Sequence, residues 1–134
     1  MPDSLDKGEP IDCDEVDTLA DGIATGGVSD LTLSLLQEHV DEVVTITDGE
    51  IARAVLLLLE RAKQLVEGAG AAPVAAILSD DLELGGWTIV PVVSGGNMDM
   101  SMLRTVLTHE LTARKQLIRL QVRTDDKLGQ IASV

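Results

Sequence analysis

Aromatic side chains are nearly absent from this 134-residue chain, which has one tryptophan and no phenylalanine or tyrosine. Hydrophobic residues still make up 45% of the sequence, so we expect a core of aliphatic side chains, alanine and methionine. The sequence shows neither an apolar run long enough to cross a bilayer nor a signal-peptide pattern. Because Cys13 is the single cysteine, an intrachain disulfide is excluded, which is consistent with a reducing cytoplasm. The length predicts one domain, or a piece of a larger one.

Basic residues are also few, since ten lysines and arginines accompany 23 acidic residues and the formal net charge is −13. A surface with this much negative charge repels nucleic acid and anionic membranes, so neither is an expected partner. An acidic tail for a basic partner would concentrate the charge at one end, and residues 1–21 do carry eight acids against Lys7. The remainder is acidic too, with 15 acids against nine bases. We therefore favour a halophilic, cytoplasmic protein, because salt screens repulsion between carboxylates.

The stretch Trp87–Asn97, WTIVPVVSGGN, is the main sequence signal. An uncharged, β-branched run that ends at glycines predicts a strand buried on both faces, as in a parallel α/β sheet. Pro91 cannot donate to a ladder and places the strand near an edge or an irregularity. Ser94 would then lie at the carboxyl end of the strand, where open α/β sheets bind small molecules. A simpler alternative is a tight turn in which Ser94 and Asn97 only cap the following helix.

Other elements are predicted from local patterns. Thr47 and Glu50 have the spacing of a capping box, which predicts a helix to about Val66. Glu60 and Lys63 have the spacing of an ion pair on that helix. Three further helices are predicted: one over residues 31–39 capped by Asp30, one of small residues ending near Leu78, and one capped by Asp99 that runs to about Ala113. Two further strands are predicted at residues 42–45 and 116–123.

Residues 116–123, QLIRLQVR, alternate apolar and polar side chains, whereas the earlier predicted strands look buried and lie between helices. A strand with one solvated face therefore begins a different unit. We place a domain boundary there, with one domain over residues 1–115 and the start of another over 116–134.

Several segments occur in an order that resembles the carboxyl-terminal part of threonine dehydratases, which belong to the pyridoxal-phosphate-dependent serine/threonine dehydratase family. The segments are VDTLADGIA, EVVTITDGEI, ERAKQLVEGAGAAPVAAIL and VVSGGNMDM, within residues 16–100. The tail, QLIRLQVRTDDKLGQIA, resembles the opening of an ACT regulatory domain, although Leu128 stands where that pattern usually has proline. The resemblance implies an α/β fold: part of a three-layer, tryptophan-synthase-β-like domain with a truncated ACT-like strand.

The resemblance also implies roles for individual residues. Ser94 would hydrogen-bond the pyridine nitrogen of the cofactor; a neutral hydroxyl would leave that nitrogen unprotonated and suit β-elimination. Gly22 would bring its backbone against the cofactor, and Asp21 would lie near the substrate. Glu67 would lie close to the ring, although Gly68 follows it where relatives often have proline.

Each of these residues also has a purely structural interpretation. Asp21 would then be a turn acid before Gly22, and Glu67 a solvated residue at a helix end. His39 and His109 fit surface or cap positions better than catalytic ones. Two further expectations concern side chains outside the predicted site. Three methionines are expected to fill core space rather than bind metal: Met98, Met100 and Met102. Cys13 is expected to be unreactive, because no cation lies near it in the sequence.

The four lysines, Lys7, Lys63, Lys115 and Lys127, do not lie in the lysine motif of the family, and no glycine-rich run matches its phosphate cradle. We therefore expect a fragment of a threonine dehydratase that is inactive alone, because no lysine would hold pyridoxal phosphate covalently. The whole enzyme would convert threonine to 2-oxobutanoate and ammonia, in isoleucine biosynthesis, as a homo-oligomer. Alternatives are a serine or hydroxyaspartate lyase, a racemase, or a non-catalytic regulatory subunit.

Overall fold

The structure is a computed structural model of the chain, and it describes residues 1–13, 16–79, 82–121 and 123. Helices and coil make up this described part, in which no β-strand forms. Along the chain the elements are α1 (Pro2–Lys7), the 3₁₀ turn η1 (Asp21–Ile23), α2 (Asp30–His39), α3 (Asp48–Leu57), the π-helical turn η2 (Leu58–Ala62), α4 (Gly68–Leu78) and α5 (Met100–Ala113). No helix among the described residues is both long and apolar enough to cross a membrane.

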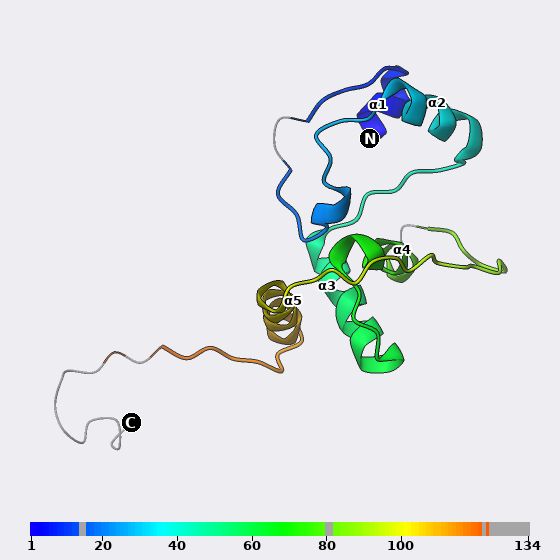
Figure 1. Cartoon of the computed structure of the whole chain (residues 1–134). Helices are drawn as coiled ribbons and strands as arrows, with labels where there is room; N and C mark the ends of the chain where they lie inside the picture. The colour runs from blue at the N-terminus through cyan, green and yellow to red at the C-terminus, as the bar shows by residue number, and fades with distance from the viewer. Residues whose placement is uncertain (14–15, 80–81, 122, 124–134) are drawn as a thin grey trace, which may run out of the picture.

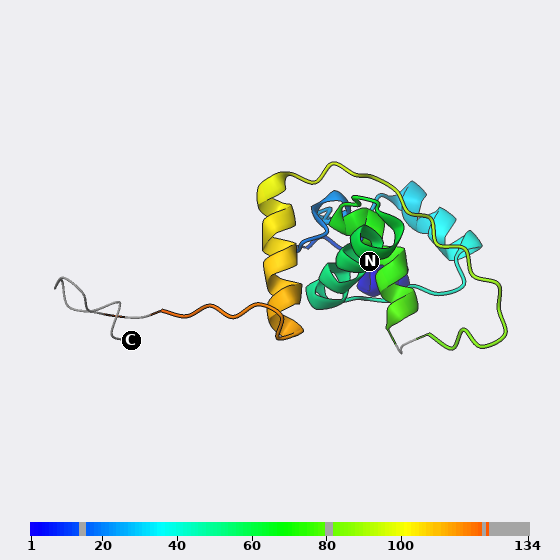
Figure 2. The same ribbon diagram turned by 90° about the horizontal axis from the view of Figure 1, so that it is seen from below.

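The core lies where α3, α4 and α5 meet, and α3 packs against both of the other helices (Figures 1 and 2). Alanine provides much of the buried surface, because small side chains allow two helix backbones to approach closely. Helices α1 and α2 contact each other away from this core. The buried cluster consists of Ala20, Ile51, Ala52, Ala54, Val55, Val66, Ala71, Ala75, Met98 and Val106.

The helix starts follow the sequence closely. The predicted capping box is confirmed at α3: the Thr47 hydroxyl accepts the Glu50 amide at 3.3 Å, and the Glu50 carboxylate accepts the Thr47 amide at 2.7 Å. These hydrogen bonds from Thr47 lower the pKa of Glu50. Asp99 caps α5 as predicted, since its carboxylate accepts the Met102 amide at 2.8 Å.

Two predicted helix details are wrong. Ser29, not Asp30, caps α2, because its side-chain oxygen accepts the Thr32 amide and Asp30 is the first helical residue. Leu33 is the buried leucine of that helix, while Leu31 is 70% exposed. The helix expected to reach Val66 instead passes through the π turn η2 and ends at Ala62, where Lys63 is the C-cap residue with a φ of 58°.

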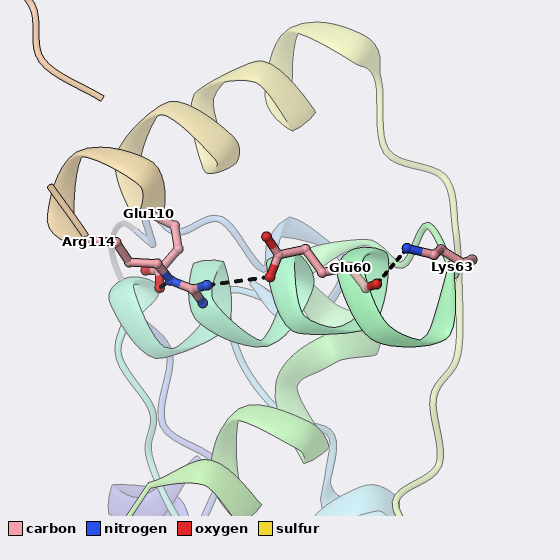
Figure 3. Close-up of polar contacts among 4 residues, drawn as sticks. All are labelled: Glu60, Lys63, Glu110 and Arg114. Atoms are coloured by element: carbon pink, nitrogen blue, oxygen red, sulfur yellow. Dashed lines mark hydrogen bonds and ion pairs between the residues drawn. The ribbon is translucent and has the colours of Figure 1, made fainter. Parts of the chain in front are cut away.

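The predicted Glu60–Lys63 ion pair does not form. Lys63 instead donates its Nζ hydrogen to the Glu60 carbonyl oxygen at 2.7 Å, which helps to satisfy the end of the helix (Figure 3). The Glu60 carboxylate faces Arg114, the C-cap residue of α5, with Nη1 and Oε2 3.5 Å apart. Arg114 also donates from Nε to the buried carboxylate of Glu110 at 2.6 Å. One guanidinium therefore links the end of α5 to η2.

The predicted strands are absent from the described residues. Residues 42–45, 87–93 and 116–121 are coil, and the described backbone hydrogen bonds include no ladder between them. A strand needs a neighbour, and these stretches do not provide one for each other. The apolar run is consequently exposed, with Trp87 at 77% and Val90 at 79%, and residues 116–121 extend away from the helices (Figure 2). The rest of the tail lies outside the described residues.

Replacing Arg114 with alanine is expected to lower the free energy of unfolding by about 1–3 kcal/mol. The reason is that Glu110, only 7% exposed, would lose its partner. Urea unfolding followed by circular dichroism measures the change. Arg104→Ala, at an exposed position of the same helix, is the matched control and should change stability by less than about 0.5 kcal/mol. Equal effects of the two substitutions would contradict this role for Arg114.

A pH dependence follows from the Asp99 cap. Hydrogen bonds from the Ser101 hydroxyl and the Met102 amide lower the pKa of Asp99 in the folded state. The cap therefore stabilises the fold fully above the unfolded-state pKa, and this contribution disappears as the pH falls through the lower, folded-state pKa. Asp99→Asn should be less stable than the parent chain at neutral pH and approach it in acid. A stability difference that stays constant across this range would refute the assignment.

Candidate functional site

The first turn of α4 is the centre of the candidate site, because two other chain segments lie directly against its glycines. A Cβ added at Gly68 would overlap the carbonyl oxygen of Leu19. A Cβ added at Gly70 would overlap the carbonyl oxygen of Ser94. Only glycine allows backbone to approach backbone this closely. The segment EGAG therefore joins the residue 19–23 and 94–97 segments.

The first of these segments is anchored by Asp48, the first residue of α3. Its Oδ1 accepts the Thr18 hydroxyl at 2.6 Å and the Leu19 amide at 3.0 Å. The chain then turns through η1, which places Gly22 beside α4: a Cβ there would lie 3.1 Å from the Ala69 Cβ. Asp21, the predicted substrate-proximal residue, is exposed at the start of this turn.

The second segment is the turn Ser94–Asn97, SGGN. Gly95 has a φ of +74°, a left-handed conformation that side chains rarely adopt, and thus requires glycine. Met98, 8% exposed, fixes the far end of the turn in the core, and Asp99 begins α5. Ser94 itself is exposed. The turn is therefore held at one side while its serine faces a region open to solvent.

Glu67 lies between the two segments. Its Oε2 accepts the backbone amide of Asn97 at 3.1 Å, and its own amide donates to the Gly95 carbonyl at 3.4 Å. Its other oxygen, Oε1, lies 3.7 Å from the position of a Cβ on Gly22. Glu67 does lie at a helix end, as the N-cap residue of α4, but it is half-buried and its carboxylate is hydrogen-bonded to the chain.

The structure thus brings together Ser94, Gly22 and Glu67, the three residues predicted to bind cofactor, and leaves Asp21 at the exposed edge of the group. Sequence reasoning missed two supporting residues, Asp48 and Gly70. The alternation of small residues in EGAGA was a signal for the close approach at Gly70. The role of Asp48 had no sequence signal, because its bonds to Thr18 and Leu19 join residues about 30 positions apart.

The other singled-out residues lie outside this group. His39 is exposed beside Glu38, and the His109 ring approaches Gly49 at the start of α3. Cys13 is exposed, and its amide donates to the Gly26 carbonyl at 2.7 Å. Met98 fills core space as predicted, whereas Met100 is 67% exposed.

Two cavities lie along α5 rather than at the SGGN turn. One, of about 690 Å³, is lined by Thr108, Thr112 and residues 117–120. The other, of about 490 Å³, is lined by Arg104, Thr105, Thr108, His109 and Arg119. Both depend on the extended segment after α5, and neither includes a residue of the candidate site. The candidate site is therefore defined by the convergence of three segments, and these two cavities are separate from it.

Sequence comparison now decides the family. A sequence model of the family described as "Pyridoxal-phosphate dependent enzyme" matches residues 1–95, most of the chain and all three converging segments up to Gly95. The chain belongs to this pyridoxal-phosphate-dependent family.

Relatives within the family are threonine ammonia-lyases. The chain is 42% identical over 130 residues to an L-threonine ammonia-lyase of Geobacter sulfurreducens, covering 96% of the chain and 32% of that protein. It is 38% identical over 128 residues to the L-threonine ammonia-lyase of Thermotoga maritima, again covering 96% of the chain and 32% of that protein. The chain therefore spans about a third of the length of the curated relatives it matches, and the threonine dehydratase resemblance found in the sequence is confirmed.

Solved structures show the fold. The threonine deaminase of T.th. superimposes with a TM-score of 0.62 at 33% identity, over 73% of this chain and 33% of that one. A maize serine racemase superimposes with a TM-score of 0.68 at 30% identity, over 84% of this chain and 36% of that one. The described part thus has the fold of the corresponding part of these enzymes.

The residues at the site fit one side of a pyridoxal-phosphate ring. The Ser94 hydroxyl can donate to a ring nitrogen, and the residue is exposed at the turn. Gly22 has no side chain and is itself exposed, so a planar ring could approach its backbone. These two groups would hold the ring by hydrogen bonding and contact rather than by charge.

Gly70→Ala is expected to displace the SGGN turn, because the added methyl group would occupy the position of the Ser94 carbonyl oxygen. The amide resonances of residues 94–97 should shift, and the free energy of unfolding should fall by about 1–3 kcal/mol. Gly85→Ala is the matched control, since a Cβ there meets nothing within 4 Å. If Gly70→Ala left the turn resonances in place, the close approach at α4 would be disproved.

Proposed function

We propose that this chain is part of a pyridoxal-phosphate-dependent threonine dehydratase, which converts L-threonine to 2-oxobutanoate and ammonia. The threonine ammonia-lyase relatives support this reaction, and each is matched over about a third of its own length. The single observation that carries the proposal within the structure is the convergence of Gly22, Glu67 and the SGGN turn at the first turn of α4. The chain would therefore contribute one wall of the cofactor site.

Within that site each residue has a distinct role. Pyridoxal phosphate, when bound, supplies a ring that withdraws electrons from the α-carbon of an amino acid. Ser94 would donate its hydroxyl hydrogen to the pyridine nitrogen, so that this nitrogen stays neutral. Gly22 would leave room for the ring to lie against backbone. Asp21, exposed beside it, would face the amino-acid side.

The chain alone should be inactive. None of its described lysines is among the groups at the first turn of α4: Lys7 ends α1, Lys63 is bonded to Glu60, and Lys115 follows α5. The amine that captures the cofactor would come from the part of the relatives that this chain does not match. Ser94 and Gly22 would then form a non-covalent wall of the site, and covalent capture of the cofactor would depend on that other part.

A second candidate is a serine-directed enzyme of the same family. The maize serine racemase superimposes with a TM-score of 0.68, and an L-serine ammonia-lyase from Rhizomucor miehei with 0.61. These reactions would use the same Ser94 and Gly22 wall, so the described residues favour neither substrate. Comparing threonine with serine as the substrate of the whole enzyme separates the two.

The proposal has a wider part. Residues 1–115 would belong to the catalytic domain, and 116–134 would begin an ACT-like regulatory domain. The net charge of −13 supports a salt-rich cytoplasm as the setting. The exposed apolar run from Trp87 to Val93 supports self-association, because exposed apolar surface is covered when copies assemble. Threonine deamination would supply 2-oxobutanoate for isoleucine synthesis.

Equilibrium dialysis with pyridoxal phosphate tests the cofactor wall. The chain should bind it saturably, and Ser94→Ala should weaken binding about 2- to 10-fold, the effect of one lost hydrogen bond. Ser34→Ala, on α2 and away from the site, is the control and should bind as the parent does. Unsaturable uptake by the parent chain, or an unchanged affinity in Ser94→Ala, would rule the wall out. Release of 2-oxobutanoate from threonine by the chain alone would contradict its expected inactivity.

A further inference from the structure

Glu67 holds the N-cap position of α4 but does not cap that helix. An N-cap side chain ordinarily accepts an amide of the first helical turn, and here no such bond exists. The carboxylate is turned instead toward the SGGN segment, where Oε2 accepts the Asn97 amide at 3.1 Å. The helix start thus forgoes a side-chain cap, and a loop 30 residues away is bonded in its place.

The same residue contacts the loop through its backbone. The Glu67 amide donates to the Gly95 carbonyl at 3.4 Å, so two hydrogen bonds join one residue to the two ends of Gly95–Asn97. The conformation they enclose is the left-handed one of Gly95, and a Cβ on that glycine would overlap the Glu67 carboxylate. The turn is therefore shaped around this side chain.

The position of the carboxylate also involves Gly22. Its Oε1 lies 3.7 Å from where a Gly22 Cβ would be, so one carboxylate separates two glycine backbones that approach it from different segments. Oε2 therefore accepts the Asn97 amide, while Oε1 occupies the space that side chains at Gly22 and Gly95 would otherwise fill.

We propose that Glu67 is a positioning residue of the site: its carboxylate fixes the SGGN turn and so sets where Ser94 presents its hydroxyl. This inference rests on the proposed function for its consequence, because Ser94 is the group that would meet the cofactor ring. The resemblance to the family implied that Glu67 lies close to the ring. In the structure its Oε2 instead bonds the Asn97 backbone amide, so Glu67 would act on the ring through the turn that carries Ser94.

Amide hydrogen exchange of the chain, measured by NMR without added ligand, tests directly whether the Glu67 carboxylate fixes the SGGN turn. Glu67→Ala should speed exchange at Asn97 about tenfold or more, because a bond to a charged acceptor is lost. Glu67→Gln retains a carbonyl acceptor of the same length and should restore most of the protection. Glu67→Asp keeps the charge but is one carbon shorter, and should fail to restore it. Glu42→Ala, at an exposed acid outside the site, is the matched control.

Two results would overturn the proposal. One is unchanged exchange at Asn97 in both Glu67→Ala and Glu67→Asp. The other is pyridoxal-phosphate affinity that falls in Glu67→Gln while Asn97 exchange stays normal, because this would mean that the carboxylate touches the ring itself. If Glu67→Ala does not fold, the comparison of Glu67→Gln with Glu67→Asp decides the question. Failure of the parent chain to bind pyridoxal phosphate would contradict the proposed function but not the positioning role of Glu67, since the exchange result does not depend on ligand.

Discussion

The arrangement of the site depends on the absence of two side chains in the first turn of α4. Gly68 and Gly70 let the carbonyl groups of Leu19 and Ser94 lie where a Cβ would otherwise be. Two further contacts at the site depend on that approach. Gly22 reaches Glu67 because residue 19 lies against the helix, and Glu67 reaches Asn97 because residue 94 does. Backbone contact of this kind is stiff, since a carbonyl group cannot rotate away as a side chain can.

The helices around the site hold its segments in place, some by direct contact and some from farther away. Asp48, at the start of α3, holds residues 18 and 19, and Asp99, at the start of α5, follows the SGGN turn directly. The start of each of three helices therefore fixes one edge of the site. Arg114 and Glu110 secure the opposite end of α5, and through Glu60 they connect it to η2. The site gains its order from a small core in which α5 is held at its start by the buried Met98 and at its end by Arg114.

Two local features of the structure could be predicted from the sequence, and the non-local ones could not. The Thr47–Glu50 capping box and the Asp99 cap depend on residues three positions apart, and both formed as expected. The strand predicted at 87–93 was wrong within the described chain, because an apolar β-branched run becomes a strand only beside another strand. The grouping of Ser94 with Gly22 came from family resemblance; periodicity alone offered no reason for it. Glu60 pairs with Arg114 instead of Lys63, and because these two residues are 54 positions apart, the local sequence pattern could not predict the pair.

The buried alanines of α3 and α4 give this part of the molecule an unequal tolerance to substitution. Residues such as Ala52, Ala54, Ala71 and Ala75 are fully enclosed, and they have no atoms beyond Cβ to lose. Almost every substitution at these positions therefore adds volume, which forces the helices apart and moves the first turn of α4 with them. A larger aliphatic residue elsewhere can be replaced by a smaller one, which leaves a void, but the buried alanines of α3 and α4 offer no comparable replacement. Their evolutionary drift would require compensating pairs, a larger residue on one helix accompanied by a smaller one opposite.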